Sequence, residues 1–259
     1  MPLRLLFVAI ILSSTFSAFS QERPYQFKDV GVSTEIGRAL DSDIILTDRF
    51  DKRVDLRRLL SSKPSVVNFV YLNCPMLCHL MLDGLLDVIG ISNYELGNDF
   101  QIITISIDPN ETNRNLTAYE TKYLNGANKD DGWLFLKGTA AEIDRITSFF
   151  GYQYQYIKRT NDYAHPSILF FYDDKISNYI EGVTFDNSAF DYALMTIKSD
   201  KSLKEKIITF CYYFDPDTQT YSLLIINILR LLCLITVVTL FIMIGRFFYL
   251  ERKAKKLKK

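Results

Sequence analysis

The sequence predicts an α/β domain with a mixed central sheet flanked by helices, followed by one C-terminal transmembrane helix. Short β-branched and aromatic segments alternate with segments of helical periodicity between residues 65 and 198. A tight acidic turn separates the last two of these strands, so they form an antiparallel hairpin within an otherwise alternating pattern. Residues 222–250 then make up one long, almost entirely apolar run.

The composition is that of a globular domain with attached membrane segments. The 259 residues are 48% hydrophobic and 23% charged, which excludes both a disordered chain and a polytopic membrane protein. The net charge of zero conceals two unlike parts. Residues 21–221 hold 21 basic and 29 acidic side chains, whereas residues 222–259 hold eight basic side chains and one acidic side chain. An acidic domain argues against a nucleic-acid partner, which requires a basic surface.

The first twenty residues have the pattern of a secretory signal peptide. Arg4 supplies the positive charge, Leu5–Leu12 is the apolar run, and Ala18-Phe19-Ser20 fits a cleavage site of the small-x-small type. An apolar run of eight residues is too short to cross a bilayer. We therefore expect residues 1–20 to direct export, and the polar segment 21–36 to be an irregular lead-in to the domain.

The apolar segment 222–250 predicts a transmembrane helix, because roughly 20 apolar residues are enough to cross a bilayer. Arg230 and Arg246 lie towards its two ends, where a long cationic side chain can reach the interface. Residues 251–259 form a basic tail containing six cationic side chains. The positive-inside rule places this tail in the cytoplasm and the N-terminal domain on the other side of the membrane.

The intervening residues, 37–221, are enough for one domain with its own core. A β-branched and aromatic run predicts a buried strand over 65–72. Pro75 then begins a helix whose apolar residues recur at spacings of three and four, and Gly90 ends it. A second strand over 102–107 is followed by a helix over 113–124, with Thr112 placed to cap it.

The second half of the domain continues the alternation. A short strand is predicted over 133–136 and a helix over 140–150. The strand 167–172 turns at residues 173–175 into the strand 176–183. A helix over 187–198 follows, and the apolar run 207–211 predicts one more strand.

Two cysteines, Cys74 and Cys78, lie where the first predicted strand turns into the first helix. A spacing of four residues in a first helical turn directs both sulfur atoms to the same side. The helix N-terminus stabilises a thiolate and lowers the pKa of a cysteine there. The pair is therefore suited to act as a redox dithiol or as a clamp for a soft metal ion. Two buried core cysteines are the structural alternative.

His165 precedes Pro166, and the strand that follows would begin beside the cysteine loop. An imidazole at that place completes a Cys-Cys-His set, which suits Cu(I), and also Zn(II) with an open position. An ordinary hydrogen-bonded loop histidine is the alternative. The other histidine, His79, is expected to be an exposed helix residue with at most a secondary role. The sequence Cys74-x-x-x-Cys78-His79 has one residue too many for haem c attachment.

The two remaining cysteines are not expected to bind a metal. Cys233 lies inside the predicted membrane helix, and Cys211 ends the predicted strand over 207–211. The chain shows no glycine-rich phosphate loop, no Ser/His/Asp set and no paired carboxylate site. The chemistry is therefore expected at the first two cysteines and His165.

In these residues the chain resembles the Sco/SenC family of exported, thioredoxin-fold copper proteins. The resemblance covers about residues 37–221. It rests on Cys74-Pro75-x-x-Cys78 after a strand, on the stretch Ser106 to Thr112, and on His165 before a strand. The loop Cys-Pro-Met-Leu-Cys and the late stretch Cys211 to Pro216 are similar to a membrane-anchored branch of the family.

The resemblance implies a thioredoxin-like domain that binds one copper ion through Cys74, Cys78 and His165, and it leaves open whether the ion is Cu(I), Cu(II) or both. It implies a role in maturing cytochrome c oxidase, either by delivering copper to the copper-A centre of subunit II or by reducing the cysteines of that centre. It also implies a single-pass protein of the bacterial inner membrane with its domain in the periplasm.

The sequence departs from the commonest family pattern at three positions near these residues. Met76 and His79 stand where an acidic residue and a proline are usual, and Pro166 separates His165 from the serine that normally follows. The membrane helix is C-terminal, whereas in the family it is usually N-terminal. The three candidate ligands are all present, so these departures bear on copper affinity, redox potential and partner choice.

Four functions compete on this sequence. A copper metallochaperone requires Cys74, Cys78 and His165 together. A thiol–disulfide reductase that acts on client cysteines requires the two cysteines but not the histidine. A peroxiredoxin-type peroxidase would instead have a single reactive cysteine near an arginine, and a metal-free assembly factor would need neither thiol.

Overall fold

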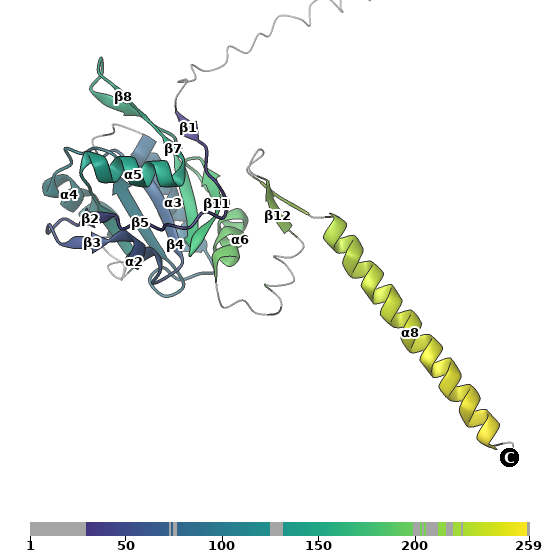
Figure 1. Ribbon diagram of the computed structural model, residues 1–259. Helices are drawn as coiled ribbons and strands as arrows, with labels where there is room; N and C mark the ends of the chain where they lie inside the picture. The colour runs from purple at the N-terminus through teal and green to yellow at the C-terminus, as the bar shows by residue number, and fades with distance from the viewer. Residues whose placement is uncertain are drawn as a thin grey trace, which may run out of the picture.

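The computed structural model places a five-stranded sheet between helices, with a long helix, α8, at the C-terminal end (Figure 1). The predicted signal peptide over 1–20 and the strand expected over 207–211 lie outside the residues that the structure describes. The described residues are 30–72, 74, 77–124, 132–198, 203, 205, 212–215, 220–223 and 225–257.

The central sheet has the strand order β11-β10-β4-β5-β6. β4 (Ser65–Val70), β5 (Gln101–Ser106) and β6 (Trp133–Leu136) run parallel to one another. β10 (Ile168–Asp173) runs antiparallel to β4, and β11 (Lys175–Glu181) runs antiparallel to β10. The predicted mixed sheet is confirmed. Because β10 and β4 are antiparallel, β10 begins at the sheet edge where β4 ends.

Four helices connect or follow these strands, and their positions agree closely with the sequence prediction. They are α3 (Leu77–Ile91), α4 (Asn113–Leu124), α5 (Ala140–Phe150) and α6 (Asn187–Ile197). The predicted cap of α4 is confirmed, because the Asn115 amide donates to Thr112 Oγ1 at 3.2 Å. The prediction that Gly90 ends α3 is wrong. The helix continues to Ile91, and Gly90 has no left-handed backbone, so it does not form a glycine C-cap.

Aromatic contacts show which helices cover which face of the sheet. Phe150 of α5 packs on Phe69 and Phe170, with ring centroids 5.7 and 4.9 Å apart. On the opposite face, α6 contacts Phe171 through Phe190 at 5.7 Å, and α4 contacts the β6 residue Trp133 through Tyr123 at 6.1 Å. Both faces of the parallel strands are therefore buried, as their continuous apolar sequences predict.

Several short elements escaped the sequence prediction. Apart from β6, the described strands of two to four residues are not predicted, because such short strands carry too little alternation to be distinguished from loops. One of them, β1, lies in the segment expected to be an irregular lead-in and pairs with β7. The short elements are β1 (Gly31–Val32), β2 (Ile45–Thr47), β3 (Arg53–Asp55), α2 (Leu56–Leu60), β7 (Tyr152–Gln153), β8 (Gln155–Ile157), β9 (Asp162–Ala164), β12 (Tyr212–Asp215) and β13 (Thr220–Leu223).

The C-terminal helix α8 spans Ile225–Leu257. Its stretch Leu229–Phe247 is 19 residues long and apolar enough to cross a membrane, and none of it is buried against the rest of the described structure. The predicted transmembrane helix is supported by this length and exposure. The helix also continues past residue 250 into the segment expected to be a separate basic tail.

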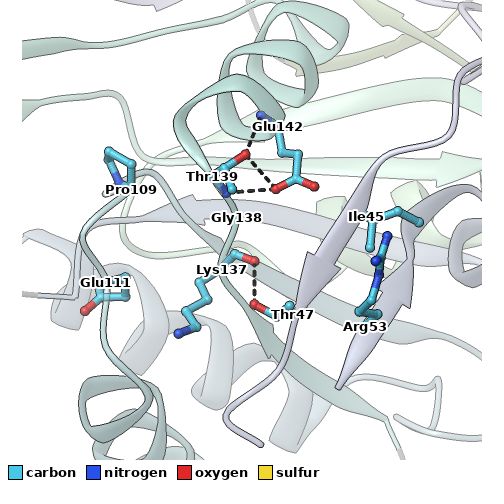
Figure 2. Close-up of a pocket in the computed structure, with 9 residues that line it drawn as sticks. All are labelled: Ile45, Thr47, Arg53, Pro109, Glu111, Lys137, Gly138, Thr139 and Glu142. Carbon is cyan, nitrogen blue, oxygen red and sulfur yellow. Dashed lines mark hydrogen bonds between the residues drawn. The ribbon is translucent and has the colours of Figure 1, made fainter. Parts of the chain in front are cut away.

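A capping box at the start of α5 gives a first testable prediction. Thr139 Oγ1 accepts from the Glu142 amide, and Glu142 Oε2 accepts from the Thr139 amide at 2.8 Å (Figure 2). Replacing Thr139 with alanine is expected to lower the free energy of unfolding by about 1 kcal/mol, because it leaves an amide without its partner. Urea denaturation followed by fluorescence of Trp133, the single tryptophan, measures this change.

The matched control is Thr117→Ala, which replaces an exposed threonine inside α4. Alanine has the higher helix propensity, so this change is expected to leave the stability unchanged or slightly raised. Equal destabilisation by the two substitutions would contradict the importance of the Thr139 cap.

Candidate metal centre

The two cysteines of the candidate site lie at the carboxyl end of β4. β4 ends at Val70 and α3 begins at Leu77, so Cys74 lies in the connecting segment and Cys78 in the first turn of the helix. Cys74 is 9% exposed and Cys78 is fully buried. The two residues are not joined by a disulfide bond. Both thiols are therefore available for metal binding or redox chemistry.

Backbone amides fix the positions of both sulfur atoms. The Tyr71 amide donates to Cys78 Sγ at 3.3 Å, and the Cys78 amide donates to Cys74 Sγ at 3.5 Å. The second contact satisfies one of the amides that a helix leaves without an intrahelical partner at its N-terminus. The strand end and the helix start thus hold the two sulfurs on the same side, as the four-residue spacing predicts.

His165 completes the cluster from the neighbouring strand. It lies between β9 and β10 and is 9% exposed, and its Nε2 atom is 3.1 Å from Cys78 Sγ. The ligand atoms of Cys74, Cys78 and His165 all lie within 4.8 Å of one another. The structure therefore brings together the three residues that the sequence singled out, and positions them to bind a metal ion.

The expectation of a lowered cysteine pKa at this helix N-terminus is wrong for Cys78. The pKa of the Cys78 thiol is raised, first because of its hydrogen bond with Cys74 and second because of its burial. The amide of Tyr71 acts in the opposite direction but does not outweigh these two effects. Without a metal, Cys78 is therefore a protonated thiol at neutral pH, in contact with the imidazole of His165.

The donor set fits a soft or intermediate metal ion. Two sulfurs and one imidazole nitrogen are the ligands that Cu(I) prefers, and carboxylates are absent from the cluster among the described residues. Burial keeps water away from the three atoms. A metal ion bound here would displace the thiol protons, since the thiolate is the ligand form of cysteine.

His79 does not join this cluster, and its expected exposure is wrong. The residue is half-buried, because α4 packs beside the start of α3. Its Nδ1 atom is 3.1 Å from Tyr123 Oη, its Nε2 atom is 3.1 Å from Tyr119 Oη, and its ring stacks on Tyr119. Both ring nitrogens of His79 are thus already engaged. Cys233 is exposed on α8, and Cys211 lies outside the described residues.

The loop after β5, whose sequence contributes to the family resemblance, is held by buried polar contacts. Glu111 is 6% exposed, and one of its carboxylate oxygens accepts from Ser106 Oγ at 3.0 Å. Tyr163 donates to Asp108 Oδ1 at 3.4 Å, and its ring packs on Tyr71 with centroids 4.9 Å apart. The loop is thereby tied to β9, and Tyr163 of β9 packs beside the end of β4. The candidate ligands lie in the segments that follow these two strands.

Sequence reasoning missed the tyrosines around the site. Tyr152 contacts His165 directly, with its hydroxyl 3.1 Å from Nδ1, while Tyr71 and Tyr163 pack beside the end of β4. No motif marks these residues, because the chain contains 16 tyrosines and their proximity to the cysteines depends on strand pairing. Only the three-dimensional arrangement identifies them.

A hollow of about 430 Å³ lies between β2, β3 and the start of α5 (Figure 2). Cations and anions both face it, with Arg53 and Lys137 opposed by Glu111 and Glu142. The capping box already uses the carboxylate of Glu142. This mixed lining favours no single class of charged ligand. The hollow is lined by Ile45, Thr47, Arg53, Pro109, Glu111, Lys137, Gly138, Thr139 and Glu142.

Solved structures share this fold. A protein of Aquifex aeolicus described as an electron transfer protein is 24% identical, with a TM-score of 0.58, over 66% of this chain and 98% of that chain. A SCO1/SenC family lipoprotein of Bacillus anthracis is 19% identical, with a TM-score of 0.50, over 63% and 99%. BsSco, described as a member of the Sco family of cytochrome c oxidase assembly proteins, is 21% identical, with a TM-score of 0.51, over 64% and 99%. The expected thioredoxin-like architecture is confirmed by this likeness.

The comparison of sequences gives the family. No curated protein matches the chain significantly. The family model described as SCO1/SenC matches residues 34–189, which is more than half of the chain and includes both cysteines and His165. The protein therefore belongs to the SCO1/SenC family.

Proposed function

We propose that this protein is a copper metallochaperone that carries one copper ion on Cys74, Cys78 and His165. We further propose that it assists assembly of the copper-A centre in subunit II of cytochrome c oxidase. The observation that supports the proposal most is the convergence of two sulfurs and one imidazole within 4.8 Å. Membership of the SCO1/SenC family supports a role in oxidase assembly.

The number and type of ligands favour Cu(I) over Zn(II). Cu(I) is stable with three soft or intermediate ligands, whereas a structural zinc site has four. Among the described residues, no further cysteine, histidine or carboxylate joins the three. The raised pKa of Cys78 does not prevent binding, because copper displaces the proton.

The unequal burial of the two cysteine residues suggests how the copper ion could be passed to a client protein. Cys74 retains 9% exposure, while Cys78 is fully buried beside His165. His165 is also 9% exposed, so a thiol or imidazole of the client can approach the copper ion from the side of Cys74 and His165. Transfer would proceed by ligand exchange, with Cys74 leaving the metal as the client ligand binds.

The proposed location is the bacterial inner membrane, with the domain in the periplasm. An export signal over residues 1–20, an apolar α8 and a basic C-terminal segment support this topology. The proposed client, a membrane-bound oxidase, would then present its copper-A site on the same side of the same bilayer.

A thiol–disulfide reductase is the second candidate function, and the proximity of two reduced cysteines favours it. In this reaction Cys74 and Cys78 would form a disulfide and give two electrons and two protons to a client disulfide. The same two thiols cannot hold copper and attack a disulfide at once, so the two activities would exclude each other at any moment.

Copper titration of the full-length chain in detergent, reduced and under nitrogen, tests the proposal. We expect one Cu(I) per chain, bound with an affinity that resists a chromophoric chelator. The Cys74→Ser/Cys78→Ser double variant, which still contains both histidines, is expected to retain none. Equal copper in the wild type and the double variant would contradict the proposed site.

A further inference from the structure

We propose that Tyr152 is a positioning residue of the copper site, whose hydroxyl, together with the Pro166 carbonyl, holds the His165 imidazole in its Nδ1–H tautomer. This inference rests on the proposed copper function, because the tautomer decides which nitrogen can bind the metal. In the Nδ1–H form, the lone pair of Nε2 faces the cysteines.

Two polar groups contact the Nδ1 atom of His165, and they are hydrogen-bonded to each other. Tyr152 Oη lies 3.1 Å from Nδ1 and donates to the Pro166 carbonyl oxygen at 2.8 Å. The same carbonyl oxygen lies 3.2 Å from Nδ1. On the other side of the ring, Nε2 is 3.1 Å from Cys78 Sγ. The imidazole is thus held between a tyrosine–carbonyl pair and a thiol.

The number of hydrogen-bond donors and acceptors around Nδ1 assigns the tautomer of His165. A carbonyl oxygen can only accept, so Nδ1 must carry a proton to make a favourable contact with the Pro166 oxygen. The single hydroxyl proton of Tyr152 is committed to that carbonyl at the shorter distance of 2.8 Å. The tyrosine oxygen therefore accepts from Nδ1–H. A neutral imidazole then has no proton on Nε2, whose lone pair faces Cys78 Sγ at 3.1 Å.

The fold holds Tyr152 rigidly in this place. Its side chain is 3% exposed and packs on Phe69, with ring centroids 4.7 Å apart. Its backbone belongs to β7, which pairs with Val32 of β1. The N-terminal strand thereby contributes to the order of the metal site.

Histidine-selective ¹⁵N labelling of the full-length chain in detergent tests the assignment directly. The chain contains two histidines, so the spectrum contains two imidazole spin systems, and a His79→Gln variant identifies them. The protein should be purified without a polyhistidine tag. In the metal-free wild type, we expect His165 to show a protonated Nδ1 and an unprotonated Nε2.

The decisive variant is Tyr152→Phe, which keeps the ring and removes the hydroxyl. We expect the His165 signals to shift towards a mixture of tautomers, and the dissociation constant for Cu(I) to rise by about tenfold or more, because hydrogen-bonding partners of metal ligands typically contribute 10–100-fold. The control is Tyr154→Phe on the same face of the chain two residues later, whose hydroxyl has no hydrogen-bond partner among the described residues. It should change neither readout.

The outcomes separate this inference from the proposed function. An Nε2–H tautomer in the wild type, or unchanged His165 signals in Tyr152→Phe, overturns the inference whether or not copper binds. Shifted signals with an unchanged Cu(I) affinity overturn the role of Tyr152 at the metal site. If the wild type shows the Nδ1–H form, Tyr152→Phe shifts it, and neither protein binds copper, the tautomer assignment stands and the proposed copper function fails.

Discussion

Replacing His165 with alanine is expected to weaken Cu(I) binding by at least about a hundredfold. The loss of a direct ligand should exceed the 10–100-fold effect typical of residues that only support a ligand. A hundredfold change corresponds to about 2.7 kcal/mol of binding free energy. Two sulfurs would remain to hold the ion, so binding should be weakened rather than abolished. Competition with a chromophoric Cu(I) chelator, using the full-length chain in detergent, measures the change.

His79→Gln is the matched control for this experiment. His79 directly follows Cys78, but both of its nitrogens are engaged by tyrosine hydroxyls on α4. We therefore expect its replacement to leave the Cu(I) affinity nearly unchanged, because neither of its ring nitrogens contacts a candidate ligand. A loss in His79→Gln equal to that in His165→Ala would show that the wrong histidine has been assigned to the metal.

The His165→Ala variant also distinguishes the copper metallochaperone from the thiol–disulfide reductase. Reduction of a disulfide substrate needs both thiols but no imidazole ligand, so His165→Ala should retain this activity if the protein has it. A chain whose only function is copper transport should instead lose its effect on oxidase assembly in this variant. Retention of oxidase maturation by His165→Ala would favour the reductase.

The site was predictable because its residues are rare in this chain and lie at strand ends. With four cysteines and two histidines, few combinations could form a metal site. Cys74 and Cys78 follow β4 directly, and His165 precedes β10. Once the 167–183 hairpin was predicted, pairing of β10 with β4 was the arrangement that placed the histidine beside the cysteines. The strand pattern and the spacing therefore indicate the cluster, and the resemblance to the Sco/SenC family favours a metal ligand over an ordinary loop histidine at His165.

The features that the sequence did not predict depend on contacts between distant segments. The raised pKa of Cys78 comes first from its hydrogen bond with Cys74 and second from its burial, and the sequence argument considered only the helix N-terminus. The half-buried state of His79 comes from tyrosines that lie about forty positions later on α4. Tyr152 reaches His165 from β7, which pairs with a two-residue strand in the expected lead-in. None of these effects leaves a local periodicity.

A large loss of folding stability is expected when Gly84 is replaced with alanine. Gly84 lies in α3, the helix that carries Cys78. A Cβ atom at this position would lie 2.1 Å from the carbonyl oxygen of Val183, a backbone atom that cannot move aside as a flexible side chain would. Overpacking of this kind typically costs 1–3 kcal/mol and occasionally more, so Gly84→Ala is expected to lower the free energy of unfolding by about 3 kcal/mol. The segment that follows β11 would have to move away from α3 to admit one methyl group.

Replacing Gly90, in the same helix, with alanine is expected to raise the stability. Nothing lies within 4 Å of a Cβ atom built there, and its backbone is not left-handed. Gly90→Ala should therefore raise the stability by roughly 0.5 kcal/mol, because alanine loses less backbone entropy in a helix. Urea denaturation followed by Trp133 fluorescence measures both variants, and Cu(I) titration should show that Gly90→Ala binds copper as the wild type does. If both alanines change the stability equally, the destabilisation reflects helix propensity, and the close approach of α3 to Val183 does not position the helix that holds the metal site.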